Sequence, residues 1–210
     1  MPDGINTDSA GYDYVVFVGS LEPSKAAEQI RAAKRCLVSG GELIIAACNP
    51  FGLKYWAGAR ADDHGFSKKT LETLLGTDGE TSWYYPMPDI KVPVTIFSDE
   101  YLPGRGELSD NRRNFDRDRL QLFDEKKVFD TVLAEGLFGE LANSFWIEAG
   151  NRTGEQRVIY SKAVCHPHGY LQESGWRKKC QKICTLSGRK RAYLSYGEVI
   201  RKIVIVLCGQ

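Results

Sequence analysis

Apolar and polar positions alternate in blocks along the first fifty residues. The run YDYVVFVGS (12–20) is apolar and ends in Gly-Ser, which is typical of a buried strand. PSKAAEQIRAAKRCL (23–37) predicts an amphipathic helix that stops at Ser39-Gly40-Gly41, and ELIIAAC (42–48) predicts a second buried strand. The expected apolar face of the helix consists of Ala27, Ile30, Ala33, Lys34 and Leu37. Strand, helix and strand of these lengths predict a βαβ unit, in which the two strands are parallel neighbours covered on both faces.

The middle of the chain mixes helical and extended patterns. SKKTLETLLG (67–76) predicts a helix with Ser67 as its N-cap and Gly76 as its stop. TSWYYPMPDI (81–90) is rich in aromatic residues and broken by proline, which predicts a short strand near a sheet edge. VPVTIFSDEYLP (92–103) is expected to be extended.

The last elements of this part are a helix and two strands. DEKKVFDTVLAEGLF (124–138) predicts one helix that begins near Asp124. NSFWIEAG (143–150) and QRVIYSK (156–162) predict two strands joined by a turn at 151–154.

Composition divides the chain into two unlike parts. The net charge is +1 over 210 residues, but 163–210 carries +7 and 1–162 carries −6. Four of the six cysteines also lie in 163–210. We therefore expect a boundary near Lys162. The sequence shows neither a long apolar run nor a basic and apolar leader, so we expect a cytoplasmic protein with reduced thiols and no membrane span.

The first part resembles a known enzyme family. YDYVVFVGSLE, the helix after it and LVSGGELIIAACNPFG resemble the second half of a class I S-adenosylmethionine-dependent methyltransferase. NPFGLKYWAG, YYPMPDIKVPVTIFSDEYLPGRGEL and EGLFGELANSFWIEAG are similar to methyltransferases found with bacterial glycan and lipopolysaccharide biosynthesis. The resemblance covers about residues 12–162. It implies an α/β fold, the C-terminal part of a Rossmann-like methyltransferase sheet, mostly parallel with an antiparallel last strand.

The sequence departs from the pattern of this family at the cofactor site. The family's cofactor site begins with a DxGxGxG loop and an acidic residue for the ribose hydroxyls, and MPDGINTDSAG before Tyr12 has neither. We therefore expect residues 1–162 to be a partial methyltransferase domain, truncated at its N-terminus. We expect S-adenosylmethionine to bind weakly or not at all. The unpaired edge of the first strand should favour self-association.

By resemblance, the cofactor lies beside the loop after the first strand, at the carboxyl ends of the strands where α/β sheets bind ligands. That loop consists of Gly19, Ser20, Leu21 and Glu22. The alternative is a plain turn, with Glu22 favoured by the helix dipole.

The candidate substrate-binding residues follow the second strand and the proline-broken strand. An amide after the second strand could orient a polar group, and aromatic rings could wall an adenine, a sugar or a cationic sulfonium. The alternative is that Pro50 ends the strand and the rings fill the core or a sheet edge. The candidates are Asn49, Phe51, Tyr55, Trp56, Tyr85 and Asp89.

Methyl transfer is an in-line displacement in which the enzyme mainly positions the reactants, with a base where the nucleophile is weak. His64 has a suitable ordinary pKa, although an isolated histidine in a polar loop is more often solvated. The other candidate bases are Asp62, Asp63, Asp89 and Asp99.

The basic, cysteine-rich tail at 163–210 carries the remaining candidate chemistry. CHPH, Cys180 and Cys184 do not match the spacing of usual zinc sites, so we expect no metal. Its basic residues suit nucleic acid, but a disordered or frameshift-derived tail that contributes little stability is the simpler interpretation. The favoured function is thus methyl transfer to a sugar or other small glycan-pathway acceptor. The alternatives are a non-catalytic binding or scaffold protein and a metal- or nucleic-acid-binding tail.

Overall fold

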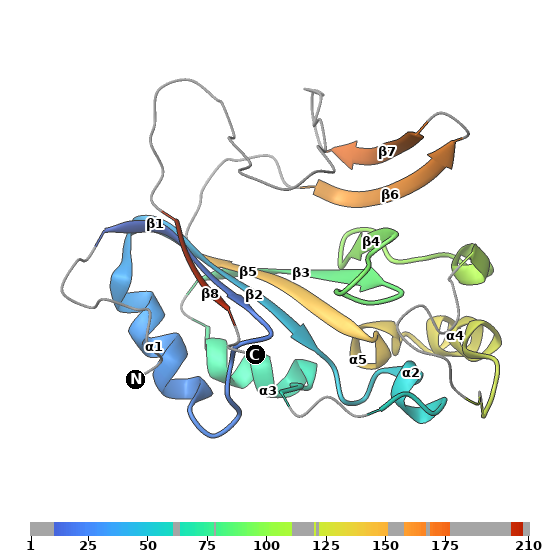
Figure 1. Ribbon diagram of the computed structural model, residues 1–210, viewed down its shortest axis with the longest axis horizontal. Helices are drawn as coiled ribbons and strands as arrows, with labels where there is room; N and C mark the ends of the chain where they lie inside the picture. The colour runs from blue at the N-terminus through green and yellow to red at the C-terminus, as the bar shows by residue number, and fades with distance from the viewer. Residues whose placement is uncertain are drawn as a thin grey trace.

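An eight-stranded mixed sheet organises the protein in the computed structural model (Figure 1). The structure describes residues 11–60, 64–77, 79–110, 120, 122–150, 158–166, 169–176 and 203–207. The strands are β1 (Tyr12–Val18), β2 (Leu37–Cys48), β3 (Glu80–Met87), β4 (Thr95–Ser98), β5 (Ser144–Gly150), β6 (Val158–His166), β7 (Gly169–Trp176) and β8 (Ile203–Leu207). The helices are α1 (Ala26–Cys36), α2 (Leu53–Trp56), α3 (Lys68–Leu75), η1 (Glu107–Asp110), α4 (Glu125–Ala134) and α5 (Phe138–Leu141). The fold is therefore α/β, as expected.

The predicted βαβ unit is confirmed. β1 and β2 are parallel neighbours, with Val15 opposite Leu43 and Val18 opposite Ala46, and α1 lies between them in the chain. The glycines after the helix have another role than the one expected. α1 already ends at Cys36 and β2 begins at Leu37, so Ser39, Gly40 and Gly41 lie in an irregular stretch of β2. Gly40 adopts a φ of 79°, which favours glycine there.

The strand order is β7-β6-β4-β3-β5-β2-β1-β8, and most pairings in it are antiparallel. β5 is antiparallel to both of its neighbours, β2 and β3. β1, β2 and β3 consequently point the same way. The expectation of a mostly parallel sheet is wrong, because β4, β5 and β6 each pair antiparallel with their neighbours. The expected neighbouring of 143–150 and 156–162 is also wrong, since β5 pairs with β2 and β3 while β6 pairs with β4 and β7.

The proline-broken strand β3 is internal and does not lie at an edge. Its pairing with β5 covers Glu80–Tyr84 and its pairing with β4 covers Tyr84–Met87. Pro86 therefore lies beyond the β5 ladder, where its lack of an N–H removes no bond to that strand. Tyr84 is paired on both sides, opposite Ser98 and Trp146.

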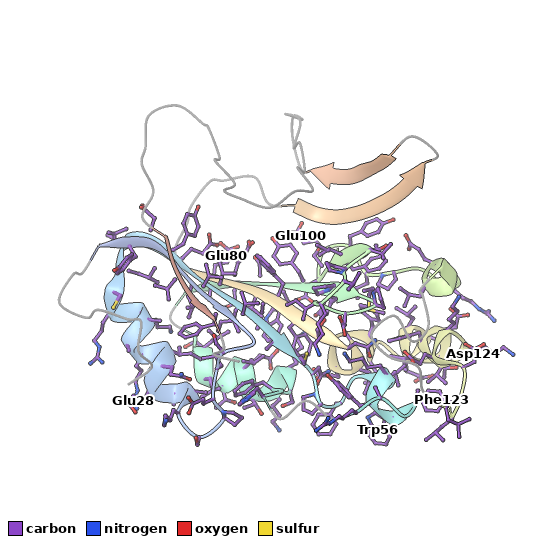
Figure 2. The ribbon with its side chains drawn as sticks, viewed as in Figure 1. Glu28, Trp56, Glu80, Glu100, Phe123 and Asp124 are labelled. Carbon is purple, nitrogen blue, oxygen red and sulfur yellow. The ribbon has the colours of Figure 1, made fainter. Side chains whose placement is uncertain are left out.

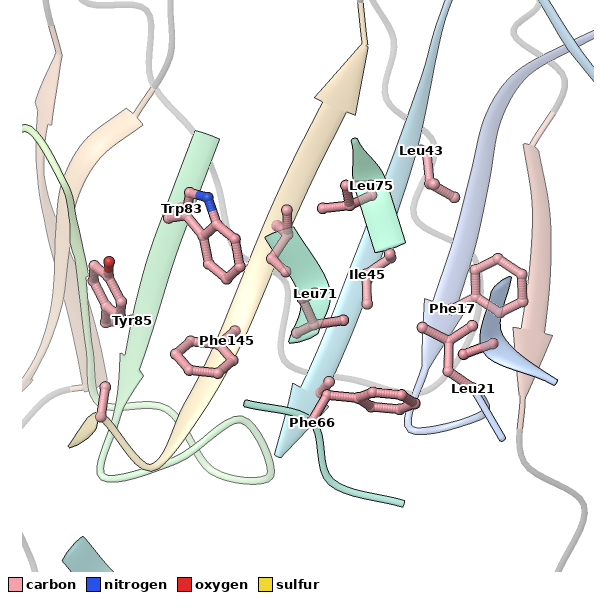
Figure 3. Close-up of a cluster of buried hydrophobic side chains, with 14 of the residues drawn as sticks. Phe17, Leu21, Leu43, Ile45, Phe66, Leu71, Leu75, Trp83, Tyr85 and Phe145 are labelled. Carbon is pink, nitrogen blue, oxygen red and sulfur yellow. The ribbon is translucent and has the colours of Figure 1, made fainter. Parts of the chain in front are cut away.

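One hydrophobic core lies on one face of the sheet. Alternate residues of the strands, such as Phe17, Ile45 and Phe145, pack in it with Leu71 of α3 (Figure 3). Ile30 of α1 belongs to the same cluster. All five α-helices contribute buried apolar side chains to this cluster and lie along that face (Figure 1). The expectation that β1 is covered on both faces is wrong, because its burial alternates and Val18 is 40% exposed.

Helix ends follow the predicted signals in three cases and depart from them in a fourth. Ser67 Oγ accepts the N–H of Thr70, and Asp124 Oδ1 accepts the N–H of Lys126, so both predicted caps are confirmed. Gly76 stops α3, also as predicted. The single helix expected over 124–138 is two helices, α4 and α5, because Gly136 between them adopts a φ of 69°.

The part after Lys162 contributes strands to both edges of the sheet. β6 and β7 form an antiparallel pair beside β4. β8 pairs in parallel with β1, so the unpaired edge expected for the first strand is wrong. Residues 151–157 and 177–202, with the expected turn and most of the basic tail, lie outside the described residues, and the expectation that the tail contributes little stability remains a prediction.

Candidate functional site

The carboxyl ends of β1, β2 and β3 share one edge of the sheet, because these strands point the same way. The loop at Gly19–Glu22 leaves β1 there, and Asn49–Phe51 leaves β2 there. The N–H of Gly19 still donates to the carbonyl of Ala46 at 2.9 Å, which holds the β1 loop against β2. The two loops predicted to be neighbours are therefore at the same edge.

The β1 loop turns sharply and anchors itself to α1. Gly19 has a φ of 62°, and Ser20 and Leu21 are 9% and 2% exposed. The carbonyl of the Gln29 side chain accepts the backbone N–H of Glu22 at 3.0 Å. The side chain of Glu22 points to solvent and pairs with Lys25 at 2.9 Å. Its hydrogen bond with Lys25 and the charge of Lys25 lower the pKa of Glu22.

Gln29 is a residue that the sequence analysis missed. It is 3% exposed, and its amide nitrogen is buried without a hydrogen-bond partner. The predicted apolar face of the helix was displaced by one residue, since the structure buries Ala26, Gln29, Ile30, Ala33 and Cys36. Ala26, Gln29 and Ala33 follow the spacing of one helical face, and that spacing was the available signal.

His64 lies at the same edge, close to Glu22. The N–H of Phe66 donates to the carbonyl of Cys48 at 2.9 Å, which returns the chain to the end of β2. The side chain of His64 is exposed, and its charge is a further cause of the lowered pKa of Glu22. The charge of His64 thus acts on Glu22 from beside the β1 loop. Asp62 and Asp63 lie outside the described residues.

Asn49 is committed to backbone contacts. It is 0% exposed, and its amide nitrogen donates to the carbonyls of Glu140 and Ala142, each at 2.7 Å. Its amide oxygen accepts the N–H of Phe51 at 3.1 Å. The amide therefore fastens the end of α5 to the end of β2. These contacts explain why a polar side chain follows an apolar strand. A direct role of Asn49 in substrate binding remains a prediction.

A buried ion pair joins the ends of β2 and β3. Lys54 of α2 donates to Asp89, and their side chains are 2% and 0% exposed. Asn143 bridges the same region, since its side chain accepts the N–H of Lys54 at 3.0 Å and donates to the carbonyl of Pro88 at 2.8 Å. Asp89 was predicted as a substrate ligand, while Lys54 was not singled out. The pair is closed to solvent, so neither group reaches a ligand from this surface.

Tyr85 belongs to a third polar group, beneath β3. It is 0% exposed, donates to Asp99 and accepts from the ammonium of Lys68 at 3.0 Å. Burial raises its pKa, and the hydrogen bond to Asp99 adds to this effect. Asp99 follows β4, which is four strands from β1, so about 19 Å separates it from the β1 loop. Asp99 is therefore too remote to act with groups at that loop.

The aromatic residues after β2 divide between surface and interior. Phe51 and Trp56 are 52% and 59% exposed, and Trp56 projects from the outer surface of α2 (Figure 2). The ring of Tyr55 lies 4.7 Å from the ammonium of Lys54. Phe51 and Trp56 are thus available to a ligand, whereas Tyr55 packs on the buried ion pair.

A cavity of about 530 Å³ lies at the opposite edge of the sheet. It is formed by the starts of β2 and β3, the end of β5 and the last turns of α1 and α3. Its lining includes Lys34, Gly40, Gly41, Gly76 and Glu80. This cavity is therefore separate from the β1 loop, where the sequence analysis placed a ligand.

Neither a metal-binding cluster nor a membrane-spanning helix occurs among the described residues. No three His, Cys, Asp or Glu residues among those it describes come together as a metal-binding group. His168, Cys180 and Cys184 of the tail lie outside the described residues. No helix in the described part of the chain is long and apolar enough to cross a membrane.

Comparisons with protein-family models, with curated proteins and with solved structures found no match to this chain.

Proposed function

We propose that this chain carries the acceptor-side half of a class I S-adenosylmethionine-dependent methyltransferase site, directed at a sugar or another glycan-pathway acceptor. The observation that carries the proposal is the parallel pairing of β1 and β2. It brings the β1 loop and His64 to one sheet edge, the place where open α/β sheets hold ligands.

The residues at this edge fit part of the cofactor. S-adenosylmethionine would supply an electrophilic methyl group, with hydroxyl and amino donors around it. The carboxylate of Glu22 is 43% exposed and can accept such donors. The buried Ser20 and Leu21 would form the floor beside it. The sequence contains no glycine-rich DxGxGxG motif to hold the rest of the cofactor, so we expect weak binding.

Two side-chain classes would serve the acceptor. The exposed rings of Phe51 and Trp56 offer apolar faces for the C–H groups of a sugar. The imidazole of His64 would take the proton from an acceptor hydroxyl, because its ordinary pKa lies near neutrality. Positioning would supply most of the rate enhancement, as in other displacements.

The alternative function is a non-catalytic binding or scaffold protein. It is favoured by the buried polar groups at this edge, since Asn49, Lys54 and Asp89 are committed to contacts within the protein. Polar groups that hold the fold together in this way are not free to bind a ligand or to take part in a reaction.

Calorimetry with S-adenosylhomocysteine, the product form of the cofactor, tests the proposal. We expect a dissociation constant roughly between 0.1 and 1 mM, which corresponds to only about 4–5 kcal/mol of binding free energy. Glu22→Gln should weaken binding, while Glu28→Gln, an exposed acid of α1, should not. Absence of binding at several millimolar ligand would favour the scaffold alternative. Equal effects of the two substitutions would remove Glu22 from the site.

A further inference from the structure

β1 is hydrogen-bonded along the same five residues on both of its sides. Tyr14–Val18 pair in parallel with Glu42–Ala46 of β2 on one side. The same residues pair in parallel with Ile203–Leu207 of β8 on the other side. β8 thus completes the ladder of β1 over the whole regular part of the strand.

β8 is held to the sheet on one side only. It ends the strand order, and β1 is its partner. Breaking one ladder of five residue pairs therefore releases it from the described sheet, and a strand held by one ladder opens more readily than an internal strand.

β7 and β8 follow one another among the strands yet lie at opposite edges of the sheet. The seven strand spacings between them correspond to about 34 Å. The 26 residues at 177–202 join them. A chain of that length reaches about 86 Å when extended, so it can deliver β8 to its own β1 or to the β1 of an adjacent molecule.

We propose that the outer side of β1 is a strand-acceptor edge whose occupant, residues 203–207, is exchanged between two copies of this chain. Pairing through backbone groups accepts the same strand in cis or in trans, as in other cases of strand addition. A second copy supplies the same sequence, IVIVL, in the same register. Reciprocal exchange closes the assembly as a two-fold dimer and leaves no β1 edge unpaired.

The sequence of β8 suits this role. All five residues are aliphatic and four are β-branched, a composition enriched in strands. Arg201 and Lys202 precede them, and such charges limit uncontrolled edge pairing. Pairing with residues 203–207, from the same chain or from a second copy, therefore satisfies an edge that would otherwise recruit other chains.

Neighbouring proline substitutions in the full-length chain test the proposal. In a parallel ladder only alternate residues of β8 direct their N–H groups to β1. One of the two substitutions Val204→Pro and Ile205→Pro therefore removes a hydrogen bond to β1. The other removes an N–H that faces away from β1, and that variant is the matched control. The probe is a labelled peptide, RKIVIVL, which is residues 201–207. The variant that loses the bond should bind it roughly tenfold more tightly than the control variant, because its edge is vacated.

Exchange between intact chains is measured with isotope-labelled and unlabelled wild-type protein. At about 1 mM protein, pairing of β8 with a second molecule competes with pairing inside its own molecule. The two proteins incubated together at this concentration should therefore form mixed dimers, which native mass spectrometry detects. The variant that releases β8 should form fewer mixed dimers. Absence of mixed dimers would overturn the proposal even if both proline variants failed to fold.

Two further outcomes would also overturn it. Equal peptide binding by the two proline variants would show that β8 does not compete for the β1 edge. Equal binding of a scrambled peptide of the same composition would show that the edge accepts any apolar strand and does not select the segment of a second copy.

Discussion

The ammonium of Lys54 and the carboxylate of Asp89 form an ion pair that is closed to solvent, with side chains 2% and 0% exposed. The pair joins α2 to the loop after β3, and Asp89 also accepts the N–H of Lys91 at 2.7 Å. Two charges removed from water depend on one another, because each alone would be buried without compensation.

Lys54→Met should therefore lower the free energy of unfolding by about 3–5 kcal/mol, since Asp89 is left buried without its counter-charge. Urea denaturation measures the change. The double variant Lys54→Met/Asp89→Asn should recover part of the loss, because no isolated charge remains. Lys69→Met, an exposed lysine of α3, is the control and should change stability by less than about 0.5 kcal/mol. Equal effects at positions 54 and 69 would show that the pair is not buried.

Asn49→Ala should cost about 2–3 kcal/mol, because the part-buried carbonyl of Glu140 and the buried carbonyl of Ala142 lose their donor. The measurement is again urea denaturation. Binding of S-adenosylhomocysteine, measured where the variant is still folded, separates structure from recognition. A stable variant with impaired binding would return Asn49 to the ligand site.

The sequence patterns predicted what depends on neighbours in the chain. The β1–α1–β2 unit follows from two apolar runs and one helical period, and the caps at Ser67 and Asp124 follow from local hydrogen bonds. The place of β5 between β2 and β3 depends on distant pairing, since Ile147 lies opposite Ile45, 102 residues earlier, and opposite Trp83, 64 residues earlier. No local pattern carries that information.

The candidate site divides in the same way. Parallel pairing of β1 and β2 is enough to place the β1 loop and Asn49 at one edge. The burial of Lys54 follows from Asp89, which is 35 residues away in the sequence. The burial of Gln29 depends on which face of α1 is turned toward the sheet. An error of one residue in predicting that face leaves Gln29 out of it.

Gly139→Ala should destabilise the contact between α5 and β3. A Cβ atom there would lie 2.9 Å from the hydroxyl oxygen of Tyr85, closer than real Cβ contacts, and 3.0 Å from the ammonium of Lys68, which is a tight contact. We expect a loss of about 1–3 kcal/mol, as in other overpacked interiors. Gly104→Ala is the matched control, because its added Cβ would be 3.7 Å from the nearest atom.

Tyr85→Phe tests the same contact from the other side. It removes the hydroxyl that Lys68 and Asp99 share, which should cost about 1–2 kcal/mol alone. In the Gly139→Ala background the cost should be smaller, because the crowded oxygen is gone. A thermodynamic cycle of the four proteins measures this coupling. Strict additivity would show that Gly139 and Tyr85 do not touch.

The ionisation of Glu22 reports on the candidate site directly. Its pKa lies below the ordinary 4.5, because Lys25 donates a hydrogen bond and a positive charge, with a smaller contribution from His64. A lowered pKa in the folded protein means that the carboxylate contributes stability above the ordinary pKa. That contribution is lost as the pH falls through the folded pKa. Lys25→Met should therefore raise the pKa of Glu22 toward 4.5 and weaken the acid dependence of stability.

His64→Gln should raise the same pKa by a smaller amount, because the charge of His64 acts at longer range than the ion pair. Carbon-detected NMR titration of the Glu22 carboxyl group measures both effects, with Lys69→Met as a control that leaves the pKa unchanged. If His64→Gln leaves the pKa of Glu22 unmoved while Lys25→Met raises it, the imidazole is not beside the β1 loop. The proposed methyltransferase site would then lack the imidazole assigned as its base.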